Sequence, residues 1–278
     1  MGAGEKWRVI FDNARHGAAN MAIDEAIVEA HSAGLVPPTL RFYTWQPAAL
    51  SIGYFQKIRE EVQLEACRSQ EIDVVRRITG GRAVLHDHEL TYSAVVREDI
   101  PVLPPTLLGS YRYLSQGLLA GLKKQGVAAE MTLPGAAFGQ SSRLPKNGAC
   151  FDAPSFYEIT VDRKKLIGSA QVRKNGTLLQ HGSILLDFSA SQMASLLLFA
   201  SEEERERCQT LLQAKATSLH HVLGVIPDST VLAQTIADEF GRTLMLEMVP
   251  DSLTDWEIER AAELEREKFA ADVWTYRR

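Results

Sequence analysis

The sequence predicts an α+β fold, with a strand-rich core and helices on its flanks and towards its C-terminus. Apolar and polar residues alternate along short runs such as 39–45 and 90–96, and this period of two is typical of strands. The Asn175-Gly176 pair favours a tight hairpin turn between two further runs. Beyond Ser189, apolar residues recur every three to four positions, which predicts helices.

Asn20 is the expected N-cap of a first helix that ends at Gly34. Residues 39–45 are expected to form a half-buried strand, with residues 50–54 as its partner after a Gln-Pro turn. A charged helix is expected over residues 58–70.

Residues 72–75 and 90–96 flank a glycine pair, so this segment predicts a strand, a tight turn and a second strand. An apolar stripe over residues 107–122 indicates a helix that faces the core. Residues 134–154 are rich in glycine, serine and proline, and we expect a long loop that is either functional or disordered. Three strands are then expected at 156–161, 165–172 and 177–186, and helices at 193–199, 202–207, 230–240 and 256–269.

The composition limits the classes of function. The 278 residues are 45% hydrophobic, which is ample for a packed core, and we expect one domain over residues 1–278. The formal net charge of −5 disfavours nonspecific binding to nucleic acid. The chain has no apolar run of about 18 residues and no apolar signal core, so we expect a cytoplasmic protein without a membrane span. Its three widely spaced cysteines favour thiols over disulfides.

Residues 76–87 carry the most informative motif, Arg-Arg-Ile-Thr-Gly-Gly-Arg-Ala-Val-Leu-His-Asp. Paired glycines let a backbone approach a ligand closely, and three arginines supply positive charge. An ordinary Gly-Gly hairpin with solvated arginines is the alternative.

This motif resembles the Arg-Arg-x-x-Gly-Gly-Gly-Ala-Val-x-His-Asp signature of the lipoate ligase and octanoyltransferase superfamily. Residues 165–171 resemble its lysine motif and residues 179–185 the strand that follows. The resemblance implies a mixed, largely antiparallel sheet with flanking helices, like the catalytic domain of lipoate and biotin protein ligases. It implies substrate binding by Arg76, Arg77, Gly80, Gly81, Arg82, His86, Gly168, Ser169, His181 and Gly182. From the residues alone, His181 either lines the acyl site or satisfies the core, and His86 and Asp87 fix the glycine loop through hydrogen bonds.

Cys150 lies in a segment without helical or strand pattern, where a cysteine is well placed to meet a substrate. Cys67 is expected to be a packing residue, and Cys208 to be structurally optional in a charged helix. The Cys-Phe-Asp-Ala-Pro context resembles the LipM-type octanoyltransferases, which implies that Cys150 is the nucleophile. In another branch the cysteine stands at the position of Leu178.

Lys165 falls on the family's lysine motif and is therefore the implied partner of the thiol. A free thiol is only about 3% ionised at pH 7, and an ammonium that lowers its pKa by roughly 1.5 raises the thiolate to about half. Lys164 would point to the opposite face of a strand, towards solvent.

No cofactor is expected. His86 and His88 would share a strand face, but no third metal ligand is clustered with them. Arg82 replaces the third glycine that is common in the ATP-dependent ligases, and no Walker A pattern occurs.

The resemblance thus implies transfer of an octanoyl group from octanoyl-acyl carrier protein, through a thioester on Cys150. The acceptor would be the lysine of a lipoyl-type domain, such as glycine cleavage H protein or the lipoyl domain of a 2-oxoacid dehydrogenase complex. An ATP-dependent lipoate ligase, an amidotransferase acting between lipoyl-type domains and a catalytically silent binding module are the alternatives.

Overall fold

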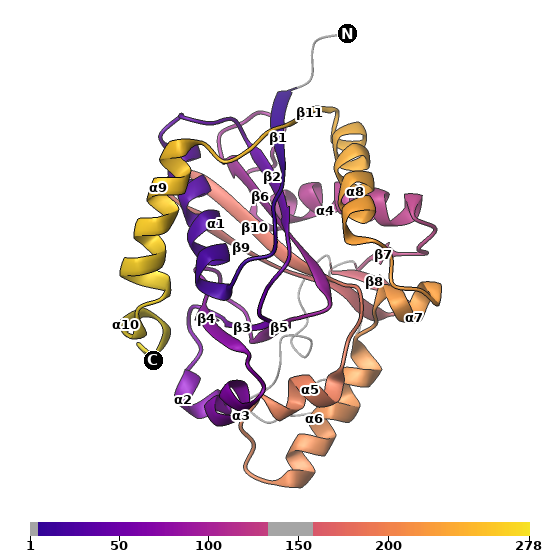
Figure 1. Ribbon diagram of the computed structural model, residues 1–278. Coiled ribbons are helices and arrows are strands. Elements are labelled where there is room, and N and C mark those ends of the chain that lie inside the picture. The colour runs from indigo at the N-terminus through magenta and orange to yellow at the C-terminus, as the bar shows by residue number, and fades with distance from the viewer. Residues whose placement is uncertain (1–4, 133–157) are drawn as a thin grey trace.

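A mixed sheet of eight strands runs through the centre of the computed structural model, which describes residues 5–132 and 158–278 (Figure 1). The strand order is β11-β1-β2-β6-β10-β9-β8-β7. β1 is parallel to both of its neighbours, and the other pairs are antiparallel. The strands are β1 (Glu5–Phe11), β2 (Thr39–Tyr43), β6 (Glu89–Arg97), β7 (Glu130–Met131), β8 (Ile159–Val161), β9 (Lys164–Lys174), β10 (Thr177–Leu185) and β11 (Leu246–Pro250). The predicted mixed, largely antiparallel sheet is therefore confirmed.

Helices pack on both faces of this sheet, and the alternating side chains of β6 contact different helices on the two faces. Its residues Leu90, Tyr92, Ala94 and Val96 face a core that α4 and α8 complete, whereas Val95 faces α1 and α9. The helices are α1 (Gly17–Ser32), α2 (Ile58–Glu61), α3 (Leu64–Ser69), α4 (Leu107–Lys124), α5 (Ala190–Ser195), α6 (Glu202–Lys215), α7 (Leu219–Leu223), α8 (Ser229–Leu244), α9 (Asp255–Leu264) and α10 (Asp272–Thr275), with a π-helix at Glu265–Phe269. Within the described ranges no helix is long and apolar enough to span a membrane.

A second sheet of three strands, ordered β4-β3-β5, lies below the first in Figure 1. It comprises β3 (Ala49–Ile52), β4 (Asp73–Arg76) and β5 (Val84–His86). The expectation that residues 50–54 pair with residues 39–45 is wrong, because β3 pairs with β4 and β5. The strands expected on either side of the glycine pair do not form a hairpin either, because residues 73–76 form β4 of the small sheet and residues 90–96 belong to β6 of the large sheet.

Two helix predictions also need correction. α1 begins after His16, and Asn20 lies one turn inside it, where its side-chain amide donates to the carbonyls of Arg15 and Thr44 at 3.1 Å. The expected helix over residues 58–70 is two short helices, because Val62 between them is extended. The C-terminal region was expected to be mainly helical, but it also supplies β11, which pairs with β1.

The hairpin from β9 to β10 is confirmed. Its turn residues Asn175 and Gly176 both have positive φ angles, 52° and 72°, as a two-residue turn of this handedness requires. The hairpin places residues 167–170 of β9 opposite residues 181–184 of β10, and this part of the large sheet carries the functional site.

Candidate active site

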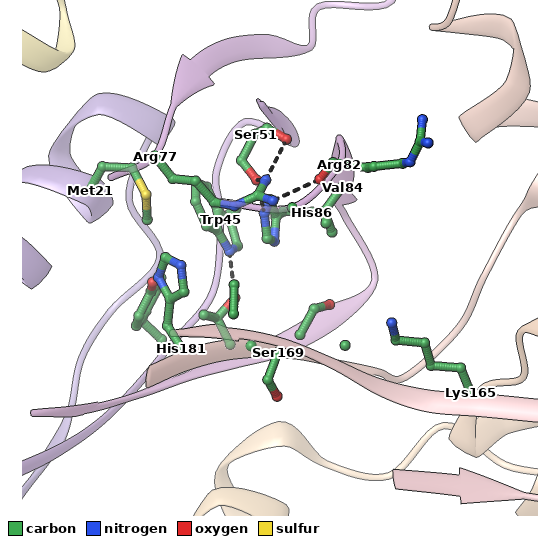
Figure 2. A pocket seen from close by; sticks show the side chains of 17 residues that line it. Met21, Trp45, Ser51, Arg77, Arg82, Val84, His86, Lys165, Ser169 and His181 are labelled. Carbon is green, nitrogen blue, oxygen red and sulfur yellow. Dashed lines mark hydrogen bonds between the residues drawn. The ribbon is translucent and has the colours of Figure 1, made fainter. Parts of the chain in front are cut away.

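A largely apolar cavity lies between the β9–β10 hairpin and the small sheet (Figure 2). Its volume is about 120 Å³, and a single water needs only about 10–15 Å³, so a chain of several non-hydrogen atoms fits. Lys165 lies at one end and Met21 at the other (Figure 2). Most predicted site residues line it: Arg77, Gly81, Arg82, His86, Lys165, Gly168, Ser169, His181 and Gly182.

β9 carries Lys165 into this cavity. The residue is 4% exposed, and its Nζ lies 2.5 Å from Oε1 of Glu158, a residue that is 6% exposed. A Cβ on Gly168 would lie 3.1 Å from the Cε of Lys165, so glycine leaves room for the lysine stem. Lys164 instead lines a separate surface groove, which confirms the predicted alternation. No pattern in the sequence pointed to Glu158.

Arg77 holds the glycine loop in place. Its guanidinium is buried and donates to the carbonyl oxygens of Ser51 at 3.0 Å, Gly80 at 2.8 Å and Arg82 at 2.7 Å. A solvated arginine on a simple hairpin is therefore the wrong description of this residue. Its positive charge interacts with backbone carbonyl groups inside the protein.

Gly81 also fixes the loop. Its φ angle is +94°, a region that favours glycine. Its carbonyl oxygen lies so close to Gly53 that a Cβ added there would be 2.0 Å away. The contact joins the glycine loop to the end of β3.

Arg76 and Gly80 do not line the cavity. Arg76 donates to the carbonyl oxygens of Gly53 at 2.9 Å, Gln56 at 2.8 Å and Thr275 at 2.9 Å. Burial lowers the pKa of Arg76 to about 10, which leaves it a cation at neutral pH. In this structure it joins the C-terminal segment to the loop after β3.

His181 lines the cavity and is also bonded into the core. Its Nδ1 lies 3.3 Å from Oδ2 of Asp24, and its Nε2 lies 2.7 Å from the Thr79 hydroxyl. Burial lowers the pKa of His181, although Asp24 opposes that shift. The ring is therefore neutral at pH 7, with Nδ1–H donating to Asp24 and Nε2 accepting from Thr79. His181 thus satisfies core hydrogen bonds and also lines the cavity.

Asp24 is a second residue beside the cavity to which no pattern in the sequence pointed. It is buried in α1 and accepts hydrogen bonds from Arg41 at 2.8 Å and from Tyr43 and Ser93 at 2.9 Å, besides that from His181. The pKa of Asp24 is lowered because these donors outweigh the effect of its burial. The carboxylate thus connects α1 to the wall of the cavity.

His86 lines the cavity. Its ring stacks on Trp45 with centroids 4.1 Å apart, and its Nε2 lies 2.8 Å from the Ser51 hydroxyl. Ser51 in turn accepts from Arg77, so His86 supports the glycine loop as expected. His88 is exposed, and the part of the chain that the structure describes holds no group of three potential metal ligands.

Cys150 lies outside the described residues. Cys67 and Cys208 are both buried in a core cluster with Leu212, so the expectation that Cys208 is structurally optional is wrong. Burial raises the pKa of Cys67 to about 11, which keeps it a thiol at neutral pH.

Known proteins match nearly the whole chain. Residues 16–241 match the lipoyl protein ligase A/B catalytic domain. Octanoyltransferase LipM of Brevibacillus brevis is 46% identical over 275 residues, which cover 99% of this chain and 100% of that protein. The Bacillus subtilis octanoyltransferase LipM is 40% identical, with 99% of each chain covered. The chain belongs to the LipM octanoyltransferases of this family.

Solved structures share the fold of this chain. A bi-partite lipoate protein ligase of Thermoplasma acidophilum has the same fold, with a TM-score of 0.79, 22% identity and coverage of 98% of this chain and 96% of that one. A lipoate-protein ligase A bound with ATP gives a TM-score of 0.75 at 25% identity, with 98% of each chain covered. As a LipM octanoyltransferase, the chain is an acyltransferase, as the sequence predicts.

Proposed function

We propose that this octanoyltransferase takes its acyl group from octanoyl-acyl carrier protein and passes it, through a thioester on Cys150, to the lysine of a lipoyl-type domain. One observation carries the proposal: a largely apolar cavity with the buried Lys165 at one end, in a chain of the LipM family. The apolar walls suit an alkyl chain, and the ammonium suits a thiolate and an oxyanion. The acceptor is a domain such as glycine cleavage H protein or the lipoyl domain of a 2-oxoacid dehydrogenase complex.

The reaction has two acyl transfers. In the first, the Cys150 thiolate attacks the carrier thioester, a new C–S bond forms, and the carrier thiolate leaves and takes up a proton. In the second, the acceptor amine attacks the acyl-cysteine, an amide forms, and the amine gives up a proton as the Cys150 thiolate leaves. Because thioester to thioester is nearly balanced and thioester to amide is downhill, neither step needs ATP.

Intact-mass spectrometry tests this proposal. The protein is mixed with octanoyl-carrier protein in the presence of EDTA and without ATP, and we expect one octanoyl adduct that maps to Cys150. Cys150→Ala abolishes the adduct, and Cys150→Ser is nearly as poor because a hydroxyl stays protonated. Cys67→Ala, which removes a buried thiol of the core, is the matched control and keeps the adduct. An adduct on Cys67 or Cys208 contradicts the mechanism.

Two competing functions have separate readouts. A strict need for ATP and magnesium identifies a lipoate ligase instead, an alternative that the similarity to the ATP-bound ligase makes worth testing. Acylation by an octanoylated lipoyl-type domain, but not by octanoyl-carrier protein, identifies an amidotransferase.

A further inference from the structure

Glu158 places a buried carboxylate against Lys165 at the end of the cavity. The two charged atoms are 2.5 Å apart, and the side chains of Glu158 and Lys165 are 8% and 5% exposed. An ammonium removed from water is costly unless an opposite charge compensates it. We propose that Glu158 is a positioning residue of the transfer reaction, which holds Lys165 as a cation pointed into the cavity. This inference rests on the proposed function.

The main chain fixes both partners. The Glu158 carbonyl accepts from the Thr132 amide at 2.8 Å, just before the first residue of β8. The Lys165 carbonyl accepts from the Thr217 amide at 3.0 Å. The carboxylate and the ammonium thus extend from anchored positions, which sets their distance.

Glu158 affects both the direction and the charge of Lys165. An ammonium carries three N–H donors, and directing one of them to Glu158 fixes the rotation of the other two. The carboxylate also favours the charged form of the lysine in a site where burial favours the neutral form. Both effects depend on the short contact between the carboxylate and the ammonium.

Glu158→Gln tests the proposal, because the amide keeps the size of the side chain and loses its charge. In Glu158→Gln we expect the rate of Cys150 octanoylation to fall at lower pH than in the wild type. The alkaline limb of its pH–rate profile should move down by about one pH unit or more, which is a tenfold change in the protonation equilibrium. Glu158→Asp should restore part of the wild-type profile. Glu98→Gln is the matched control. Glu98 forms an ion pair at 2.8 Å with Arg173, which belongs to β9 as Lys165 does, and neither residue lines the cavity. The pH profile of this variant should equal that of the wild type.

The double variant separates a role through Lys165 from an independent one. Lys165→Ala leaves a buried carboxylate beside the reaction, so adding Glu158→Gln should make the enzyme no slower than Lys165→Ala alone. If the rate losses caused by the two substitutions multiply in the double variant, the two residues act independently, and the proposal is overturned.

Lysine labelling gives a readout that does not need the transfer reaction. The protein is treated with acetic anhydride across a range of pH, and the modification of Lys165 and Lys164 is measured by peptide mass. In Glu158→Gln we expect labelling of Lys165 to begin at lower pH, while the neighbouring Lys164 is unchanged. Identical Lys165 profiles in the two proteins overturn the inference, even if octanoyl transfer is confirmed. If wild type forms no octanoyl adduct, the proposed function fails, and a shifted Lys165 profile still supports the pairing.

Discussion

Single residues shape the two ends of the cavity. Lys165 marks the end where we place the chemistry, and Met21 of α1 lies at the other end, among Tyr43 and Trp45. If the alkyl chain extends from Lys165 towards Met21, the methionine side chain limits its length. Chain-length preference is then a property of one residue on a helix.

Met21→Ala should therefore widen the preference towards longer chains. An added methylene in a hydrophobic pocket is worth about 1–3 kcal/mol when space allows it, so the kcat/KM ratio of decanoyl to octanoyl donor should rise at least about tenfold. The variant should also lose about 2–5 kcal/mol of stability, as large-to-small core changes do. Met193→Ala, in a separate core cluster, should lose stability without changing the ratio. An unchanged ratio in Met21→Ala places the end of the acyl chain elsewhere.

The glycine positions allow packing and function to be separated. A Cβ on Gly53 meets the Gly81 carbonyl at 2.0 Å, whereas a Cβ on Gly80 meets nothing within 4 Å. Gly53→Ala should therefore destabilise the fold by about 1–3 kcal/mol, the usual cost of overpacking. Gly80→Ala should leave stability within about 0.5 kcal/mol. Urea unfolding checks both. A Gly80→Ala protein of normal stability but reduced transfer rate would support a substrate role for Gly80.

At the level of elements, His31 joins α1 to β6 and to the loop after the helix. Its Nδ1 lies 2.8 Å from the Val36 carbonyl, and its Nε2 accepts from the Arg97 amide at 3.0 Å. Burial lowers the pKa of His31. Only the neutral ring can accept the hydrogen bond from the Arg97 amide, so protonation of His31 in the folded state breaks this hydrogen bond.

Stability should consequently fall as the pH drops. Because the folded-state pKa of His31 lies below the unfolded value of about 6.5, the unfolded chain takes up the proton first. The resulting loss begins near pH 6.5 and amounts to at most about 1.4 kcal/mol per pH unit for one such group. His181, whose pKa is also lowered, adds to it.

Urea unfolding at pH 7.5, 6.5 and 5.5 measures this slope. His31→Gln removes the titrating ring and should flatten the dependence, although it lowers the stability at pH 7.5. His88→Gln changes an exposed histidine and should leave the slope at its wild-type value. A wild-type slope in His31→Gln assigns the pH dependence to other groups.

At the scale of the whole molecule, a net charge of −5 contrasts with the basic residues near the site. Arg76, Arg77, Arg82 and Lys164 suggest electrostatic recognition of an acidic carrier protein. The structure changes this expectation, since Arg76 and Arg77 are buried against carbonyl oxygens. Arg82 and Lys164 are partly exposed, and of these four residues they are the ones placed to steer the donor.

Added salt should then raise the KM for octanoyl-carrier protein, because screening limits exposed charges to about 8 Å at physiological ionic strength. Arg82→Gln should reduce this salt dependence. Arg266→Gln, an exposed change on the π-helix, should keep it. A KM that stays constant from low to high salt excludes steering from the mechanism.

The sequence by itself determined the features that depend on local periodicity. The alternation along residues 90–96, the Asn175-Gly176 turn and the opposite directions of Lys164 and Lys165 all follow from the geometry of a strand or a two-residue turn. The motifs also located the segments that line most of the cavity. Each of these features involves residues close together in the chain.

Only the tertiary structure decided which segments and charges meet. Alternation shows the faces of a strand but not its neighbours, so the position of β3 between β4 and β5 was not predictable. Arg76 and Arg77 are adjacent in sequence, yet one bonds to Thr275 and the other to the glycine loop. Asp24 meets His181 across 157 positions, and Glu158 meets Lys165 across a turn. A buried charge is compensated by whichever group the fold brings to it, and that choice depends on packing, not on local pattern.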